Sequence, residues 1–191
     1  KAALILYRKN GDHLLNMYIR SGRNGIPEEM EAYYDQHEAV FQKYSSNTDV
    51  HELMEDFYWE LKKIFAKAPP VDKEFIVYRG AHTVEHFKGQ IDNIYVNKGI
   101  VSTSINAQVA IGFSGGHYMT HIHIPVGAKV IYNFLSVYFG EYEIILPDQT
   151  YFLVTKDFQP VRYVSVKQAL AQGWDSGEID ILTNQCLLLK E

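Results

Sequence analysis

The chain has 191 residues, of which 47% are hydrophobic and 14% aromatic, enough to bury a large core in one domain, with or without a helical lobe. Charged residues make up 21% and the formal net charge is -5, with no run of Lys or Arg, which argues against a nucleic-acid-binding protein. Cys186 is the only cysteine, which excludes an internal disulfide framework and zinc sites built on thiolates.

Residues 1 to about 70 are predicted to be mostly helical. One helix is indicated by side chains that recur at steps of three and four, namely Met30, Tyr33, Tyr34, His37, Val40, Phe41 and Tyr44. Thr48 or Asp49 can cap the next helix, and Ala68-Pro69-Pro70 ends it. These stripes are expected to form core, and Tyr33 or Tyr34 is the candidate for a hydroxyl that faces a cleft.

After Pro70 the period of the apolar residues changes from near four to two, which predicts strands. The expected strands are Phe75 to Tyr78, Gly99 to Ser104, Tyr118 to Pro125, Lys129 to Tyr132, Glu141 to Leu146, Tyr151 to Thr155 and Val161 to Val166. Asn106 can cap a short helix that ends at Gly115-Gly116. Helices followed by many short strands predict an α+β fold. We expect a single domain over 1–191, with a helical lobe at 1–70 and a β core at 71–191.

Two glutamates, Glu141 and Glu143, stand at the start of a strand that ends at Pro147. Side chains alternate faces along a strand, so the two carboxylates are expected on the same face. Like charges side by side are unfavourable unless solvent, a cation or a reaction uses them. A Glu-x-Glu pair alone also fits an exposed strand end, so its meaning depends on the rest of the chain.

Two other motifs precede the glutamates: Tyr78-Arg79-Gly80 ends the first strand, and Ser102-Thr103-Ser104 lies on the next. With Glu141-Tyr142-Glu143 in this order, residues 75 to 165 resemble the Arg–Ser–Glu class of mono-ADP-ribosyltransferases, which includes the clostridial binary-toxin and C3-like exoenzymes. The preceding helices are similar in order to the helical lobe of the toxins. The resemblance implies an N-terminal helical lobe followed by a two-sheet mixed β core that holds the NAD site.

The resemblance also implies roles for individual residues, with NAD as the substrate and no metal. Glu143 is expected to stabilise the positive charge that develops on the ribose and to bind a ribose hydroxyl. Glu141 reaches the acceptor, and Arg79 holds the pyrophosphate or ribose of NAD. Gly80 lets the backbone approach the nicotinamide amide, and Ser102 is expected to hydrogen-bond Glu143.

The resemblance has implications for three further positions. Phe113, eleven residues after Ser102, corresponds to a phenylalanine that stacks on nicotinamide, although by itself it fits a core residue. Tyr138, with Phe139 beside it, corresponds to an aromatic turn that meets the protein substrate. Gly116 stands where some toxins carry an arginine that contacts a cofactor phosphate, so backbone amides or His117 replace that charge, or phosphate binding is weaker.

The reaction implied by the resemblance moves ADP-ribose from NAD to a protein side chain, and a glutamate at position 141 indicates arginine. The alternatives are an NAD glycohydrolase with the same site, an inactive binding module of the same fold, and a glycosidase that uses Glu141 and Glu143. A glycosidase leaves Arg79 and Ser102 unexplained. The resemblance implies a secreted or injected effector that acts on a target protein in the cytosol of a host cell.

Two further expectations concern a metal site and a membrane span. His121 and His123 share a strand face and invite a metal, but they lack a nearby carboxylate or third ligand, which favours a solvated strand face. No apolar stretch is long enough to span a bilayer, and no signal peptide is visible. Residue 1 is Lys rather than Met, so the chain can be a fragment whose targeting information lies outside it.

Overall fold

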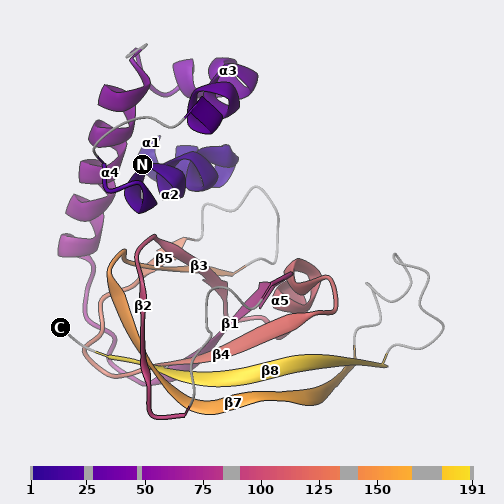
Figure 1. The fold of residues 1–191 in the computed structure, drawn as a ribbon. Coiled ribbons are helices and arrows are strands. Elements are labelled where there is room, and N and C mark those ends of the chain that lie inside the picture. The colour runs from indigo at the N-terminus through magenta and orange to yellow at the C-terminus, as the bar shows by residue number, and fades with distance from the viewer. Residues whose placement is uncertain are drawn as a thin grey trace.

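The computed structural model describes residues 2–23, 28–46, 49–83, 91–133, 142–164 and 178–189 (Figure 1). Its N-terminal part is helical, as predicted, with α1 (Ala2–Leu6), the π-helical turn η1 (Tyr7–Gly11), α2 (Asp12–Arg20), α3 (Glu28–Gln42) and α4 (Val50–Lys67). The Asp49 side chain accepts a hydrogen bond from the amide of Glu52 and caps α4, one of the two caps expected.

The helices share one apolar core, because each presents a stripe of large side chains to the others. Ile131 and Ile145 from two strands, and Ile100 directly before another, belong to the same cluster, so the helices pack on one face of that part of the sheet. Tyr33 and Tyr34, one of which was expected to face a cleft, pack in and against the core of the helices. Tyr33 stacks on His37, and Tyr34 is buried with a hydroxyl that has no hydrogen-bond partner among the described residues.

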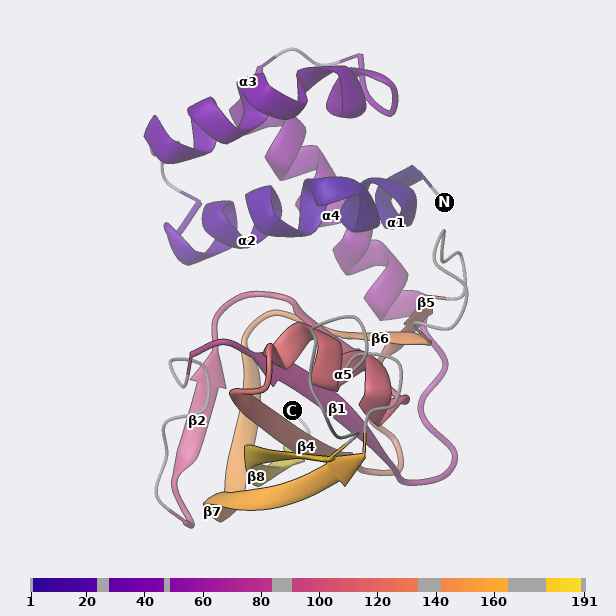
Figure 2. The same ribbon diagram turned by 90° about the vertical axis from the view of Figure 1, so that its right-hand side faces the viewer.

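In the described part of the chain, eight strands form the second part of the fold. They are β1 (Phe75–Ala81), β2 (Ile94–Asn97), β3 (Val101–Ser104), β4 (Tyr118–Ile124), β5 (Ile131–Asn133), β6 (Glu143–Leu146), β7 (Thr150–Val164) and β8 (Glu178–Leu188). Their order in the sheet is β2-β7-β8-β4-β1-β3-β6-β5, and among these strands β4 and β8 pair in parallel. Figure 2 shows α1–α4 above the strands, and α5 (Ala107–Ser114) beside β1.

The α+β class is confirmed, whereas the expected count of two sheets is wrong. Within the described residues the strands form one continuous sheet, because β1 and β3 join at a single register pair, Tyr78 with Ser104. The two strands expected around 151–155 and 161–166 are one long strand, β7, whose register against β8 shifts on either side of Lys156. That the whole chain is a single domain stays a prediction.

Gly80 sets the distance between α5 and β1. A Cβ atom at this position would lie 1.9 Å from the carbonyl oxygen of Ala110 and 2.6 Å from the amide nitrogen of Ser114. The helix backbone therefore packs directly on the strand, which a glycine alone allows. None of the helices in the described part of the chain combines the length and the apolar character needed to cross a membrane.

Candidate active site

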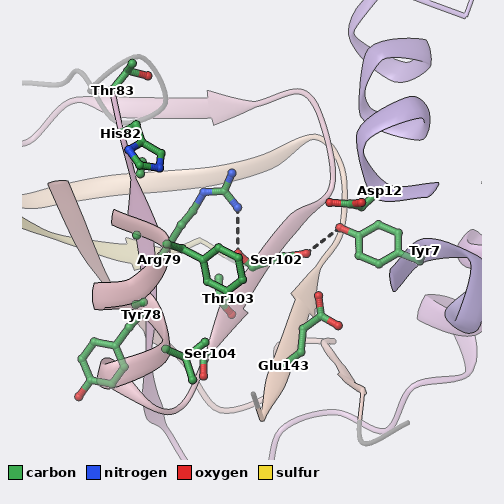
Figure 3. Close-up of a pocket in the computed structure, with 15 residues that line it drawn as sticks. Tyr7, Asp12, Tyr78, Arg79, His82, Thr83, Ser102, Thr103, Ser104 and Glu143 are labelled. Carbon is green, nitrogen blue, oxygen red and sulfur yellow. Dashed lines mark hydrogen bonds between the residues drawn. The ribbon is translucent and has the colours of Figure 1, made fainter. Parts of the chain in front are cut away.

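A cavity of about 500 Å³ opens where the strands meet the N-terminal helices (Figure 3). Five residues that the sequence singled out line it together: Arg79, Gly80, Ser102, Phe113 and Glu143. They come from β1, β3, α5 and β6, so residues far apart in the chain converge on one place. A polar and aromatic lining in a cavity of this size is typical of a small-molecule site.

Arg79 is held by the backbone of the neighbouring strand. Its Nη1 donates a hydrogen bond to the carbonyl oxygen of Ser102 at 2.9 Å. Burial of the guanidinium lowers the pKa of Arg79 from its usual value, yet an arginine keeps its charge at physiological pH. The site therefore contains an oriented positive group.

The hydroxyl of Ser102 points toward the N-terminal helices (Figure 3). It lies 2.9 Å from the hydroxyl of Tyr7 on the π-helical turn, and either oxygen can be the donor. The side-chain partner that this structure gives to Ser102 is thus Tyr7. The expected hydrogen bond between Ser102 and Glu143 stays a prediction.

Glu143 is the first residue of β6 and has a strand neighbour on each side. It is the register partner of Ser104 in β3 and of Asn133 in β5. The amide Nδ2 of Asn133 donates to Oε2 of Glu143 at 2.7 Å. The preceding residue, Tyr142, has a left-handed backbone with φ of 44°. That Glu141 and Glu143 share a face stays a prediction, because Glu141 lies outside the described residues.

Tyr7 and Asp12 also line the cavity, and neither was singled out from the sequence. Tyr7 is almost fully buried, and this burial raises the pKa of its phenol. Burial likewise raises the pKa of the Asp12 carboxyl. The one signal for this region is Gly11, a glycine within a helical segment, which usually has a local structural reason.

Phe113 and the glycine turn after it form another part of the site. The Phe113 side chain is 61% exposed, so it is not the core residue that its sequence alone allowed. The amides of Gly115, Gly116 and His117 donate within the turn, to Gly112, to the Ser114 hydroxyl and to the Ser114 carbonyl. How the chain compensates for the arginine that some toxins carry at the position of Gly116 stays open, since these amides already have partners within the turn and His117 is not among the residues that line the cavity.

The remaining predicted residues divide into two groups. Glu141, Tyr138 and Phe139 lie outside the described residues. His121 is hydrogen-bonded to the Tyr163 hydroxyl at 2.8 Å, and the described part of the chain contains no cluster of three or more His, Cys, Asp or Glu that could hold a metal.

Comparisons with known proteins agree with this geometry. A family model described as ADP-ribosyltransferase exoenzyme matches residues 1–170. The catalytic domain of VahC from Aeromonas hydrophila has 21% identity and a TM-score of 0.56, with 98% of this chain and 96% of that chain covered. Plx2a, an ADP-ribosyltransferase toxin from Paenibacillus larvae, has 16% identity, a TM-score of 0.58, and coverages of 98% and 84%. The ATR domain of Salmonella SpvB has 18% identity and a TM-score of 0.59, with 98% of this chain and 97% of that chain covered.

A search of curated protein sequences finds no match. At their low identities the solved structures establish the fold, whereas the family model spans most of the sequence, including Arg79, Ser102 and Glu143. The chain therefore belongs to the ADP-ribosyltransferase exoenzyme family, NAD-dependent enzymes for which NAD is the substrate.

Proposed function

We propose that the chain is a mono-ADP-ribosyltransferase that moves ADP-ribose from NAD to a side chain of an acceptor protein. The observation that carries the proposal is the convergence of Arg79, Ser102 and Glu143, from three strands, on one cavity. The cavity is of a size that suits a small-molecule cofactor.

In the proposed reaction, the bond between the nicotinamide nitrogen and C1′ of the ribose breaks. The bonding electrons leave with nicotinamide, which becomes neutral and needs no acid to protonate it. The ribose carbon gains oxocarbenium character, as in glycoside cleavage. The acceptor forms the new bond to C1′ and loses a proton.

Glu143 is proposed to stabilise the positive charge on the ribose. At about 4 Å and an effective dielectric constant near 20, the attraction between the two charges is about 4 kcal/mol. This corresponds to about three decades in rate. The gain requires a carboxylate that is already oriented, because a group that must reorganise during the reaction loses much of the benefit.

Arg79, Phe113 and Gly80 are proposed to hold NAD. Arg79 would bind the pyrophosphate or ribose, since its forked donors suit phosphate oxygens. Its bond to the Ser102 carbonyl supports this role, because the guanidinium is already oriented. Phe113 would stack on nicotinamide with its exposed ring, and the Gly80 backbone would approach the nicotinamide amide.

We propose arginine as the acceptor side chain. A carboxylate at position 141 can pair with a guanidinium in a forked geometry and help to remove its proton. Tyr138 and Phe139 are proposed to contact the acceptor protein. The test supplies agmatine, a free guanidine, together with NAD. Wild type is expected to form ADP-ribosyl-agmatine and Glu141→Gln is not, whereas equal product from both would reject arginine specificity.

The enzyme class is tested with wild type, Glu143→Gln and Glu60→Gln in a cell lysate that contains labelled NAD. Glu60 is an exposed residue of α4 paired with Lys63, so its variant controls for the loss of a carboxylate. Wild type and Glu60→Gln are expected to label a protein. Glu143→Gln is expected to release nicotinamide about a thousandfold more slowly.

Each other outcome has a distinct meaning. Nicotinamide release without a labelled protein would replace the transferase by an NAD glycohydrolase. Unchanged turnover in Glu143→Gln would reject the mechanism, and NAD binding without turnover in wild type would leave a binding module. Following the toxins of this family, we propose that the chain acts as an effector in the cytosol of a host cell.

A further inference from the structure

We infer that Asn133 is a positioning residue that holds the carboxylate of Glu143 in the orientation that the reaction needs. The inference rests on the proposed function, because it assigns a further residue to the same site. Asn133 is the last residue of β5 and stands directly opposite Glu143, the first residue of β6. Side chains that are register partners in an antiparallel pair lie on the same face and are close neighbours.

The contact between the two side chains is short and charge-assisted. The Asn133 Nδ2 atom donates to Oε2 of Glu143 at 2.7 Å, in the range expected for a hydrogen bond to an ionised group. A glutamate has three rotatable side-chain bonds, so it needs a partner to keep one orientation. Asn133 itself is 1% exposed and is held by the surrounding packing. A rigid donor thus fixes a flexible acceptor.

The oxygen of the Asn133 amide is in an environment that lowers the stability of the fold. The Oδ1 atom of Asn133 is buried without a hydrogen-bond partner among the described residues, which destabilises a fold. Turning the amide over would place Oδ1 against a carboxylate oxygen, so that two acceptors would face each other. A leucine would fill a similar volume without the unpaired oxygen. An amide is therefore expected here only if its donor serves the site.

The test compares Asn133→Leu with a matched control, Asn184→Leu. Asn184 in β8 is also 1% exposed with an unpaired Oδ1, and it does not line the cavity. For Asn133→Leu, kcat for nicotinamide release is expected to fall by about 10- to 100-fold, as for loss of a hydrogen bond to a charged group. The KM for NAD is expected to stay the same. The unfolding midpoint is expected to stay the same or to rise. Asn184→Leu is expected to keep its kcat.

A second variant, Asn133→Asp, adds a readout that a purely structural role would not change. A carboxyl group opposite Glu143 opposes ionisation of the pair, so the acid limb of the pH–rate profile is expected to move to higher pH. The other titratable groups that line the cavity are the same in both proteins, namely Tyr7, Asp12, Tyr78, Arg79 and His82.

The outcomes separate a failure of the proposed function from a failure of the inference about Asn133. If wild type releases no nicotinamide, the proposed function fails and the inference fails with it. If wild type is active and Asn133→Leu keeps its kcat, the inference alone is overturned. The same holds if Asn133→Leu loses activity together with its unfolding midpoint while the acid limb of Asn133→Asp stays in place.

Discussion

The hydroxyl groups of Tyr7 and Ser102 lie 2.9 Å apart, although the residues are 95 positions apart in the chain. Tyr7 belongs to a π-helical turn, a deviation from α-helix that is often found at functional sites. Through this contact the N-terminal helices supply part of the cavity wall and orient a side chain of β3. The helices are therefore expected to affect catalysis as well as stability.

Replacing Tyr7 with phenylalanine tests this link. Tyr7→Phe leaves Ser102 without its partner, so the free energy of unfolding is expected to fall by about 1 kcal/mol, and nicotinamide release is expected to slow. Tyr34→Phe is the control, because it removes a buried hydroxyl that has no partner among the described residues. That variant is expected to be as stable as wild type or more stable. Equal losses in both variants, measured by urea denaturation, would contradict the prediction.

Gly80→Ala is expected to displace α5 from β1. The new methyl group would lie 1.9 Å from the carbonyl oxygen of Ala110, and backbone cannot yield as a flexible side chain would. We expect the free energy of unfolding to fall by about 1 to 3 kcal/mol. Because Phe113 moves with α5, the KM for NAD should rise. Wild-type values for both the melting temperature and KM would show that the close packing is unimportant.

Stability is expected to depend on pH through His121. Burial, assisted by His123 and Lys156, lowers the pKa of His121 from its ordinary value. The unfolded chain therefore binds the proton at higher pH than the folded one. The stability that the neutral ring contributes is present above about pH 6.5 and is lost as the pH falls through the folded-state pKa.

His121→Gln removes the titration and keeps a hydrogen-bonding side chain for Tyr163. Its unfolding midpoint is expected to fall less than that of wild type between about pH 7.5 and about pH 5. Parallel curves for the two proteins would show that another group causes the dependence.

Cys186 is expected to report on unfolding. The side chain is buried in β8, and burial raises the pKa of its thiol to about 12. Alkylation by iodoacetamide requires the thiolate, so at about pH 8 the native protein should react very slowly. The alkylated fraction, measured by mass spectrometry, should follow the urea unfolding curve. Rapid alkylation of the native protein would contradict the burial.

The sequence predicted well those features that local chemistry determines. The capped start of α4 and the strand that ends at Tyr78-Arg79-Gly80 are examples. Arg79 and Ser102 meet because both motifs stand on strands that adjoin in the sheet. The cap and the strand end depend on residues within one turn or one strand, where propensity and turn chemistry act, whereas the contact of Arg79 with Ser102 also needs the pairing of β1 with β3.

Features that depend on packing between distant segments were missed. Tyr7 lines the cavity because η1 lies against β3, and no pattern within the helix encodes that approach. β7 was predicted as two strands, since the register shifts beside Lys156 break the alternation of apolar residues. The turn at Tyr142 was missed because its left-handed backbone does not follow from residue type.

The single register pair between Tyr78 and Ser104 has a consequence for substrate entry. Further register pairs would hold β1 and β3 together along their length, beside the cavity that Arg79 and Ser102 line. With one pair, the angle between β1 and β3 can change without loss of a further register pair among the described residues. We expect the cavity to widen in this way when it admits NAD and releases nicotinamide.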